Sequence, residues 1–280
     1  MDRFAAGRAM PACRVMGIVN VTPDSFSDGS RFLQHEDALA HARRLVAEGA
    51  DWLDVGGEST RPGAAPVPLD EELRRVIPLI RAICEDPAIA VPVSVDTSKP
   101  EVMRAAIEAG AAMINDINAL REPGAVEVCA EAGIPVCLMH MQGQPRTMQQ
   151  SPGYGDVVTE VSAFLRERVG VCEAAGIARH DIVIDPGFGF GKTPEHNLAL
   201  LKHLGVLVDT GYPVLAGLSR KSLFQAVLGA PLEERLTGSV TAALVAAQKG
   251  AAFVRVHDVK ETCDALRVWQ AIESEAIAAF

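Results

Sequence analysis

Positive charge is scarce in this sequence. Its 280 residues contain 26 Lys and Arg against 36 Asp and Glu, which gives a formal net charge of −10. Proteins that bind nucleic acids usually carry a basic patch or stripe, and a net acidic composition argues against one. We therefore expect no nucleic-acid partner, and any anionic ligand would have to be held by a few local cations.

Cysteine pairs and long apolar runs are also missing. The six cysteines include no C-x-x-C pair, so they predict neither a metal site nor a disulfide framework, and most lie in apolar runs where buried free thiols are usual. No apolar run is long enough to span a membrane, and the first residues lack the apolar stretch of a secretion signal. We expect no membrane partner and a cytoplasmic location.

No linker, low-complexity tract or run of charge divides the chain, so we predict a single domain over residues 1–280. What the chain does contain is a series of short apolar runs, each ending in a polar residue. There are eight of them (14–20, 51–57, 91–97, 111–117, 134–140, 181–187, 212–219 and 251–257). Apolar runs that are continuous rather than alternating favour parallel strands covered on both faces.

Helical patterns fill the intervals between these runs. Apolar side chains recur at helical spacing from Leu69 to Cys84 and from Leu39 to Val46. Glycines at positions 49, 110, 133, 176 and 250 favour helix ends just before the next strand. Strand–helix repeats of this number, within about 250 residues, predict an α/β fold, a (β/α)8 TIM barrel. A doubly wound open sheet is the alternative, but the glycine-rich first turn typical of that fold is missing after Asn20.

The barrel prediction places polar side chains around one mouth. Active sites of such barrels lie at the carboxyl ends of the strands. The residues that this sequence has there are Asn20, Asp54, Asp96, Asn115, Asp185, Arg255 and His257. A single aspartate after a strand is also a common N-cap for the next helix. For Asp54 and Asp116 the two interpretations stay open.

The segment DPGFGFGKT, at residues 185–193, looks like a phosphate-binding loop but departs from that motif. Gly191, Lys192 and Thr193 fit its end. Pro186 stands where the first glycine should be, and proline has no N–H to donate. We therefore expect this loop not to hold a nucleotide.

Eight segments of the chain resemble those of the dihydropteroate synthase family, in the same order and at similar spacing. The resemblance runs from about Val15 to Glu261 and rests on NVTPDSFSDG, DVGGESTRPGA, SVDT, NDI, LMHMQG, DPGFGFGK, GLSRKS and RVHDVKE. Ser30 is a departure, because the family often has a glycine there. The resemblance implies a (β/α)8 barrel that joins (7,8-dihydropterin-6-yl)methyl diphosphate to 4-aminobenzoate in folate biosynthesis, giving 7,8-dihydropteroate and pyrophosphate. It also implies a homodimer built from helices late in the chain, and a target of sulfonamides.

The resemblance assigns the pterin ring to side chains at the strand ends. Asp185 would accept hydrogen bonds from the 2-amino group and N3–H of the ring, since a carboxylate offers two acceptors to two neighbouring donors. Asp96 and Asn115 would meet the remaining ring nitrogens. Lys221 would donate to the pterin carbonyl, and the planar guanidinium of Arg255 would lie against the ring.

The same resemblance assigns the diphosphate and its metal ion. Asn20 would coordinate Mg²⁺ through its amide oxygen, a hard ligand suited to that ion. His257 and Arg255 would hold the β-phosphate.

A third group of residues is implied for 4-aminobenzoate. Thr60, Arg61 and Pro62 would arrive from the loop after the second strand. Lys221 and Ser222 lie where GLSRKS turns from a strand into a helix, whose first N–H groups favour an anion. Phe190 would form an apolar wall for the ring.

The implied reaction is dissociative and needs no covalent nucleophile. Pyrophosphate leaves first, and the carboxylates of Asp96 and Asp28 would stabilise the cation left on the pterin methylene. Together with Lys221 these two aspartates form the implied catalytic set. The arylamine then attacks.

Two alternatives remain beside this one. A methyltetrahydrofolate-dependent methyltransferase also binds pterin through Asp and Asn at strand ends, but it does not need a diphosphate site or the segments NVTPDSFSDG and SRKS. A non-catalytic paralogue that binds pterin should show broken loops or lost strand-end residues, and the sequence shows neither.

Overall fold

The computed structural model describes residues 13–21, 31–59 and 64–276. Four of the predicted site residues lie outside these ranges, namely Asp28, Thr60, Arg61 and Pro62. The roles implied for them stay predictions from the sequence.

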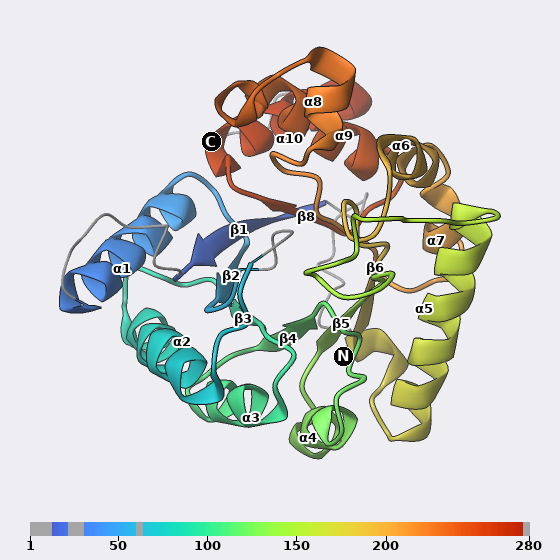
Figure 1. Cartoon of the computed structure of the whole chain (residues 1–280). Coiled ribbons are helices and arrows are strands. Elements are labelled where there is room, and N and C mark those ends of the chain that lie inside the picture. Colours follow the sequence, from blue (N-terminus) through green and yellow to red (C-terminus); the bar gives the residue numbers. More distant parts are fainter. Residues whose placement is uncertain (1–12, 22–30, 60–63, 277–280) are drawn as a thin grey trace.

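Parallel strands form the centre of the molecule, and helices surround them (Figure 1). The strands are β1 (Arg14–Asn20), β2 (Trp52–Gly56), β3 (Val93–Asp96), β4 (Met113–Asp116), β5 (Val136–Met139), β6 (Ile182–Asp185), β7 (Leu215–Ala216) and β8 (Phe253–Val256). Each lies inside one of the eight predicted apolar runs. They form one sheet in the order β6-β5-β4-β3-β2-β1-β8-β7, and a parallel bridge between Ile184 and Val214 brings its two ends together. The predicted (β/α)8 barrel is confirmed, and the open-sheet alternative is not.

Helices connect consecutive strands on the outside of this barrel. They are α1 (Arg31–Ala47), α2 (Leu69–Glu85), α3 (Pro100–Glu108), α4 (Ala125–Ala132), α5 (Val157–Ala174), α6 (Pro194–Lys202), α7 (Gly205–Val208), α8 (Leu223–Leu228), α9 (Leu236–Gln248) and α10 (Val259–Ser274). The five glycines predicted at helix ends all have positive φ, between 59° and 109°, as a left-handed C-terminal residue requires. Within the described part of the chain, no helix combines the length and the apolar character needed to cross a membrane.

Alternation along each strand divides the side chains into an outer and an inner set. Outer residues such as Leu53, Val55, Val93 and Val95 belong to the large core that the helices cover. Inner residues at the beginning of the strands form a separate apolar cluster of Met16, Trp52, Met113, Cys137, Val183, Leu215 and Phe253. Two residues further along β2, β4, β6 and β8 the inner positions are polar. We call Asp54, Asp96, Asn115, Asp185 and Arg255 the polar layer; each is the next inward residue after a member of the apolar cluster, except for Asp96, which follows Ser94.

The barrel therefore has an apolar floor and a charged layer above it. Burial of each large floor side chain contributes about 1.5–3 kcal/mol to stability. The carboxyl ends of the strands carry the groups that can do chemistry.

Candidate active site

Arg255 organises the polar layer. Its Nε donates to Asp54 Oδ2 at 2.6 Å and its Nη2 donates to Asp96 Oδ2 at 2.9 Å. Asn115 Nδ2 donates to the same oxygen of Asp54 at 3.1 Å. Four side chains from β2, β3, β4 and β8 are thus joined across the inside of the barrel.

The structure decides between the two interpretations of Asp54 and Asp116. Asp54 lies within β2, is 0% exposed and joins the polar layer, so it is not a helix cap. Asp116 faces outward from the end of β4, where its carboxylate accepts hydrogen bonds from the backbone N–H groups of Asn118 and Leu120, both at 2.7 Å. Its role is to close the turn after β4, as a local side-chain–backbone interaction does.

Burial and charge shift the titration of this layer. Desolvation, with a smaller contribution from neighbouring Asp54, raises the pKa of Asp96 to about 7 against the lowering effect of Arg255. Burial alone would lower the pKa of Arg255, but the carboxylates of Asp54 and Asp96 raise it above its ordinary value. Arg255 is therefore always charged, while Asp96 can change its protonation near neutral pH.

Asp185 ends β6 and begins the loop of residues 185–193. Its Oδ1 accepts a hydrogen bond from the backbone N–H of Gly187 at 2.7 Å. Burial raises the pKa of Asp185 to about 6, although that hydrogen bond and the charge of Lys221 oppose the shift. One carboxylate is thus fixed in orientation and remains mostly ionised above pH 7.

The alternating glycines of this loop bring it close to its neighbours. Gly187 has φ +66°, and a Cβ there would lie 1.9 Å from the carbonyl oxygen of His140 in the loop after β5. Gly189 has φ +79°, and a Cβ there would lie 2.9 Å from Lys221 Cδ. The glycines let the loop lie directly against the β5 loop and against Lys221, which a side chain would prevent.

Lys221 and Phe190 meet at this contact. Lys221 Nζ lies 4.2 Å from the centre of the Phe190 ring, a cation–π distance. Desolvation lowers the pKa of Lys221 to about 8, against the raising effect of Asp185. Lys221 is thus a half-buried cation of the site and not a lysine on a helix surface. Ser222, the next residue, is exposed, and its side chain makes no capping hydrogen bond to the short helix α8.

Arg220, which sequence reasoning missed, holds the backbone before Lys221. It is a non-glycine residue at φ +56°, a conformation that is uncommon without support. Its guanidinium pairs with Asp258 at 2.5 Å, its N–H donates to Ser239 Oγ at 2.8 Å, and its carbonyl accepts from Arg235 at 3.1 Å. These partners keep a strained residue beside a site residue, as is common at functional sites.

His257 follows β8 and contacts Ser219 after β7. The backbone N–H of His257 donates to Ser219 Oγ at 3.1 Å, and His257 Nδ1 lies 3.0 Å from the same oxygen. In the tautomer in which the Ser219 hydroxyl donates to Nδ1, the ring proton of His257 lies on Nε2. Burial, and then the charges of Arg255 and Arg220, lower the pKa of His257 to about 3, so the ring is neutral.

Asn20 ends β1 and faces β2 and β3. A Cβ on Gly56 would lie 3.5 Å from Asn20 Oδ1 and 3.4 Å from Asp96 Cβ, so the amide oxygen lies near the polar layer. No group of three or more His, Cys, Asp or Glu side chains in the described residues is placed to hold a metal. An ion here would have few protein ligands.

These observations agree with comparisons to known proteins. A family model described as pterin binding enzyme matches residues 16–257. Dihydropteroate synthase of Escherichia coli (strain K12) is 52% identical over 273 residues, which cover 97% of this chain and 96% of that protein. The chain belongs to the dihydropteroate synthase family. It is an enzyme, a transferase that condenses (7,8-dihydropterin-6-yl)methyl diphosphate with 4-aminobenzoate to give 7,8-dihydropteroate and pyrophosphate.

Solved structures from the family share the fold over nearly the whole chain. Dihydropteroate synthase of Xanthomonas albilineans, solved with 4-aminobenzoic acid, superposes with a TM-score of 0.88 at 56% identity, covering 94% of this chain and 93% of that one. The Yersinia pestis enzyme, solved with a sulfonamide drug, gives a TM-score of 0.88 at 50% identity over 94% of this chain and 95% of that one.

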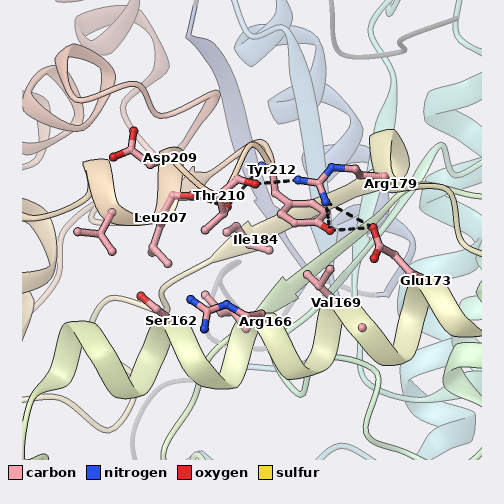
Figure 2. Close-up of a pocket in the computed structure, with 13 residues that line it drawn as sticks. Ser162, Arg166, Val169, Glu173, Arg179, Ile184, Leu207, Asp209, Thr210 and Tyr212 are labelled. Carbon is pink, nitrogen blue, oxygen red and sulfur yellow. Dashed lines mark hydrogen bonds and ion pairs between the residues drawn. The ribbon is translucent and has the colours of Figure 1, made fainter.

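A groove on the outer wall of the barrel is separate from this site (Figure 2). It has a volume of about 570 Å³ and runs between α5 and the residues around α7. Arg179 and Tyr212, which line it, precede β6 and β7, so this part of the groove lies toward the amino ends of those strands. The chemistry of the family belongs to the opposite end, where the polar layer lies.

Proposed function

We propose that the polar layer is the pterin pocket of this enzyme. The ring's 2-amino group and N3–H would donate to Asp185, whose orientation is fixed by Gly187. Asp96 and Asn115 would meet the other ring nitrogens, and Lys221 would donate to the carbonyl. What supports this assignment is that Asp185 and Asn115 are buried above an apolar floor, with Asp96 and Lys221 half-buried beside them.

Arg255 would lie flat against the pterin ring. Two of its three nitrogens are already engaged by carboxylates, which fixes the guanidinium plane and leaves its faces for stacking. Asp54 holds this arginine and Asn115 at once. It would therefore orient two pterin ligands.

We propose that His257, with the remaining nitrogen of Arg255, holds the β-phosphate of the substrate. In the tautomer in which Ser219 donates to Nδ1, the neutral His257 ring keeps Nε2–H as a hydrogen-bond donor for an anion.

The residues at the mouth fit a magnesium ion of the kind that substrate phosphates complete. Mg²⁺ keeps several waters and is commonly bound by one or two protein oxygens together with phosphate oxygens. Asn20 would hold it, since its amide oxygen is a hard donor near the polar layer. When bound, the ion would neutralise charge on the diphosphate as it leaves.

The aminobenzoate would bind beside the pterin, against Phe190. The Phe190 ring packs on Met139, Met141 and Met148, and Lys221 lies over its face. Lys221 and the exposed Ser222 would meet the carboxylate. Thr60, Arg61 and Pro62 are assigned to the same subsite by the family resemblance alone. A sulfonamide would compete for this place.

In the proposed reaction one bond breaks before the other forms. The bond between the pterin methylene and the diphosphate oxygen breaks, and its electron pair leaves with pyrophosphate. The carboxylates of Asp96 and Asp28 would stabilise the resulting cation. The amine nitrogen of aminobenzoate then bonds to the methylene and loses a proton.

We also propose a homodimer formed through the late helices. Exposed large apolar side chains gather there, at Val227, Leu228, Leu232, Leu236, Val268 and Ile272. These residues lie on or beside α8, α9 and α10, which are neighbours in Figure 1. Light scattering should give twice the mass of one chain, and Leu228→Glu with Ile272→Glu should reduce it to the mass of one. The cytoplasmic location and the single domain over residues 1–280 stay predictions from the sequence.

The observation that carries the pterin assignment is the clamp of Arg255 between Asp54 and Asp96. The test is pyrophosphate release by the purified protein with Mg²⁺, measured with both substrates and with each alone. We expect release only with both. Turnover no faster than in buffer would favour the non-catalytic paralogue.

A further inference from the structure

Lys192, the P-loop-like lysine of the 185–193 loop, is buried and serves no phosphate. It is 3% exposed. Its Nζ donates to the carbonyl oxygens of Gly187 at 2.9 Å, Phe190 at 3.0 Å and His140 at 3.3 Å, and it lies 2.9 Å from His140 Nδ1. Burial lowers the pKa of His140 to about 3, so the ring is neutral and its Nδ1 can accept this hydrogen bond.

An ammonium in this position is expensive to bury. Lys192 forms no ion pair with a carboxylate of the described residues, and its direct partners are the three carbonyl groups and the His140 ring. Burial lowers the pKa of Lys192 to about 7, although the charge of Asp185 opposes the shift. Buried charges without a counter-ion are rare because desolvation opposes them. A residue kept under these conditions must perform a task that an apolar side chain would not.

The contacts of Lys192 show what that task is. The Gly187 carbonyl also accepts from the N–H of Phe190 at 3.1 Å, which forms the turn that carries the phenylalanine. Lys192 binds the carbonyl at each end of this turn and, through His140, ties the turn to the β5 loop. One amino group therefore gathers three carbonyl groups around the turn that carries Phe190, and the contacts of Gly189 with Gln149 and Asn197 hold the same turn from outside.

We propose that Lys192 is a positioning residue for 4-aminobenzoate, which acts by holding Phe190 in the wall of that subsite. The inference rests on the proposed function of Phe190. Asp185 depends less on Lys192, because it ends a strand and its carbonyl accepts from the N–H of His140 at 2.9 Å. Loss of Lys192 should therefore affect the second substrate more than the pterin.

The test compares Lys192→Met with Lys192→Gln. Both side chains have similar volume, but only glutamine can donate hydrogen bonds to the carbonyls. Lys202→Met is the matched control, since Lys202 is exposed at the end of α6. Calorimetry measures the Kd of a pterin, and steady-state kinetics measure kcat and the KM for aminobenzoate.

We expect Lys192→Met to raise the KM for aminobenzoate at least tenfold while the pterin Kd changes less than threefold. Lys192→Gln should recover most of this loss, and Lys202→Met should behave as the wild type. In a double-mutant cycle, adding Lys192→Met to Phe190→Ala should change the KM little further, since the lysine acts through the ring.

Three results would overturn the proposal. They are an unchanged KM in both variants, equal losses for the two substrates, and full additivity with Phe190→Ala. If Lys192→Met does not fold, the glutamine variant decides alone, and equal losses for the two substrates in it would overturn the proposal. An inactive wild type would instead refute the proposed function, and the pterin Kd would show whether the pocket binds at all.

Discussion

Replacing Asp185 by asparagine tests the pterin pocket with almost no change of shape. Asp185 Oδ1 already accepts the N–H of Gly187, so the carboxylate has one side fixed by the loop. In Asp185→Asn the amide must place either its oxygen or its NH₂ toward Gly187. In the first orientation the NH₂ faces the donors of the pterin, and in the second it faces the N–H of Gly187. Either way one donor faces another donor.

The size of the effect follows from that unpaired donor. Leaving a buried polar group unsatisfied costs about 1–3 kcal/mol. This corresponds to a loss of pterin affinity of about 5- to 140-fold, since each 1.4 kcal/mol is a factor of ten. The protein itself should not be destabilised. Burial raises the pKa of Asp185 from 3.8 to about 6. The ionised carboxylate therefore lowers the stability of the fold as the pH rises from about 4 to above 6. The neutral amide of asparagine does not ionise and removes this effect.

The pH dependence of binding gives a second readout. Protonation replaces an acceptor by a donor, so wild-type pterin affinity should fall as the pH drops below about 6, where Asp185 takes up a proton. Asp96, whose pKa is about 7, titrates in both proteins and contributes the same background. The ratio of wild-type to mutant affinity should therefore shrink toward one at low pH.

Calorimetry with a pterin at several pH values, with thermal unfolding of the same samples, checks both points. Asp116→Asn is the control, because Asp116 is a buried strand-end aspartate outside the polar layer. It should lose stability, by about 1–3 kcal/mol, and keep its pterin affinity. An Asp185→Asn protein with wild-type affinity at pH 8 would mean that the pterin is anchored elsewhere.

Three other substitutions follow from the site. Gly187→Ala places a Cβ 1.9 Å from the carbonyl oxygen of His140 and should abolish pterin binding. Gly133→Ala is the control: Gly133 also has positive φ, but a Cβ there would have no atom within 4 Å. It should cost about 1–2 kcal/mol of stability and leave pterin binding unchanged. Asp54→Asn should lower stability by about 1–3 kcal/mol and weaken pterin binding, since two ligands share its oxygen; equal binding in calorimetry would refute its orienting role. Arg61→Ala should raise the KM for aminobenzoate and lower kcat with pterin affinity intact. Equal losses of aminobenzoate and pterin binding would contradict the assignment of aminobenzoate to the loop residues and of pterin to the strand-end residues.

The elements of this fold could be predicted because their signals are local. Each strand lies in a continuous apolar run, and a glycine with positive φ ends the helix before several of them. The barrel prediction also placed the polar residues at the strand ends around one mouth, because the carboxyl ends of parallel barrel strands meet at the same face.

Local sequence signals did not show that Asp54 belongs to the polar layer and that Asp116 closes a turn. Both follow apolar residues, and both suit a cap. Strand parity separates them: Asp54 is in phase with the inward Trp52, whereas Asp116 is one residue out of phase with the inward Asn115. That signal was present in the sequence, although it requires knowing which residues face inward.

Lys192 and Arg220 could not be predicted from local patterns. Their partners come from different loops, so only the folded chain shows that one binds three carbonyls and the other supports a strained backbone. The sequence predicted that the 185–193 loop does not hold a nucleotide, but it gave no role to Lys192, and only the tertiary structure shows the carbonyl groups that this lysine binds.

The charges of the site predict where a magnesium ion is needed. The polar layer and Lys221 contain three carboxyl groups (Asp54, Asp96, Asp185) and two basic side chains (Lys221, Arg255), so with all of them ionised the formal charge is −3 + 2 = −1. Such a layer favours the cation that forms on the pterin methylene but repels the diphosphate, and the neutral His257 adds only a donor. We therefore expect the substrate diphosphate to bind much more weakly after chelation of Mg²⁺, while a pterin without phosphate binds equally with and without the ion. Calorimetry of both ligands with the metal and with excess chelator distinguishes the cases, and Asn20→Ala should reproduce the effect of the chelator. If the diphosphate binds tightly without Mg²⁺, cations outside the described residues must neutralise it, and the assignment of Asn20 fails.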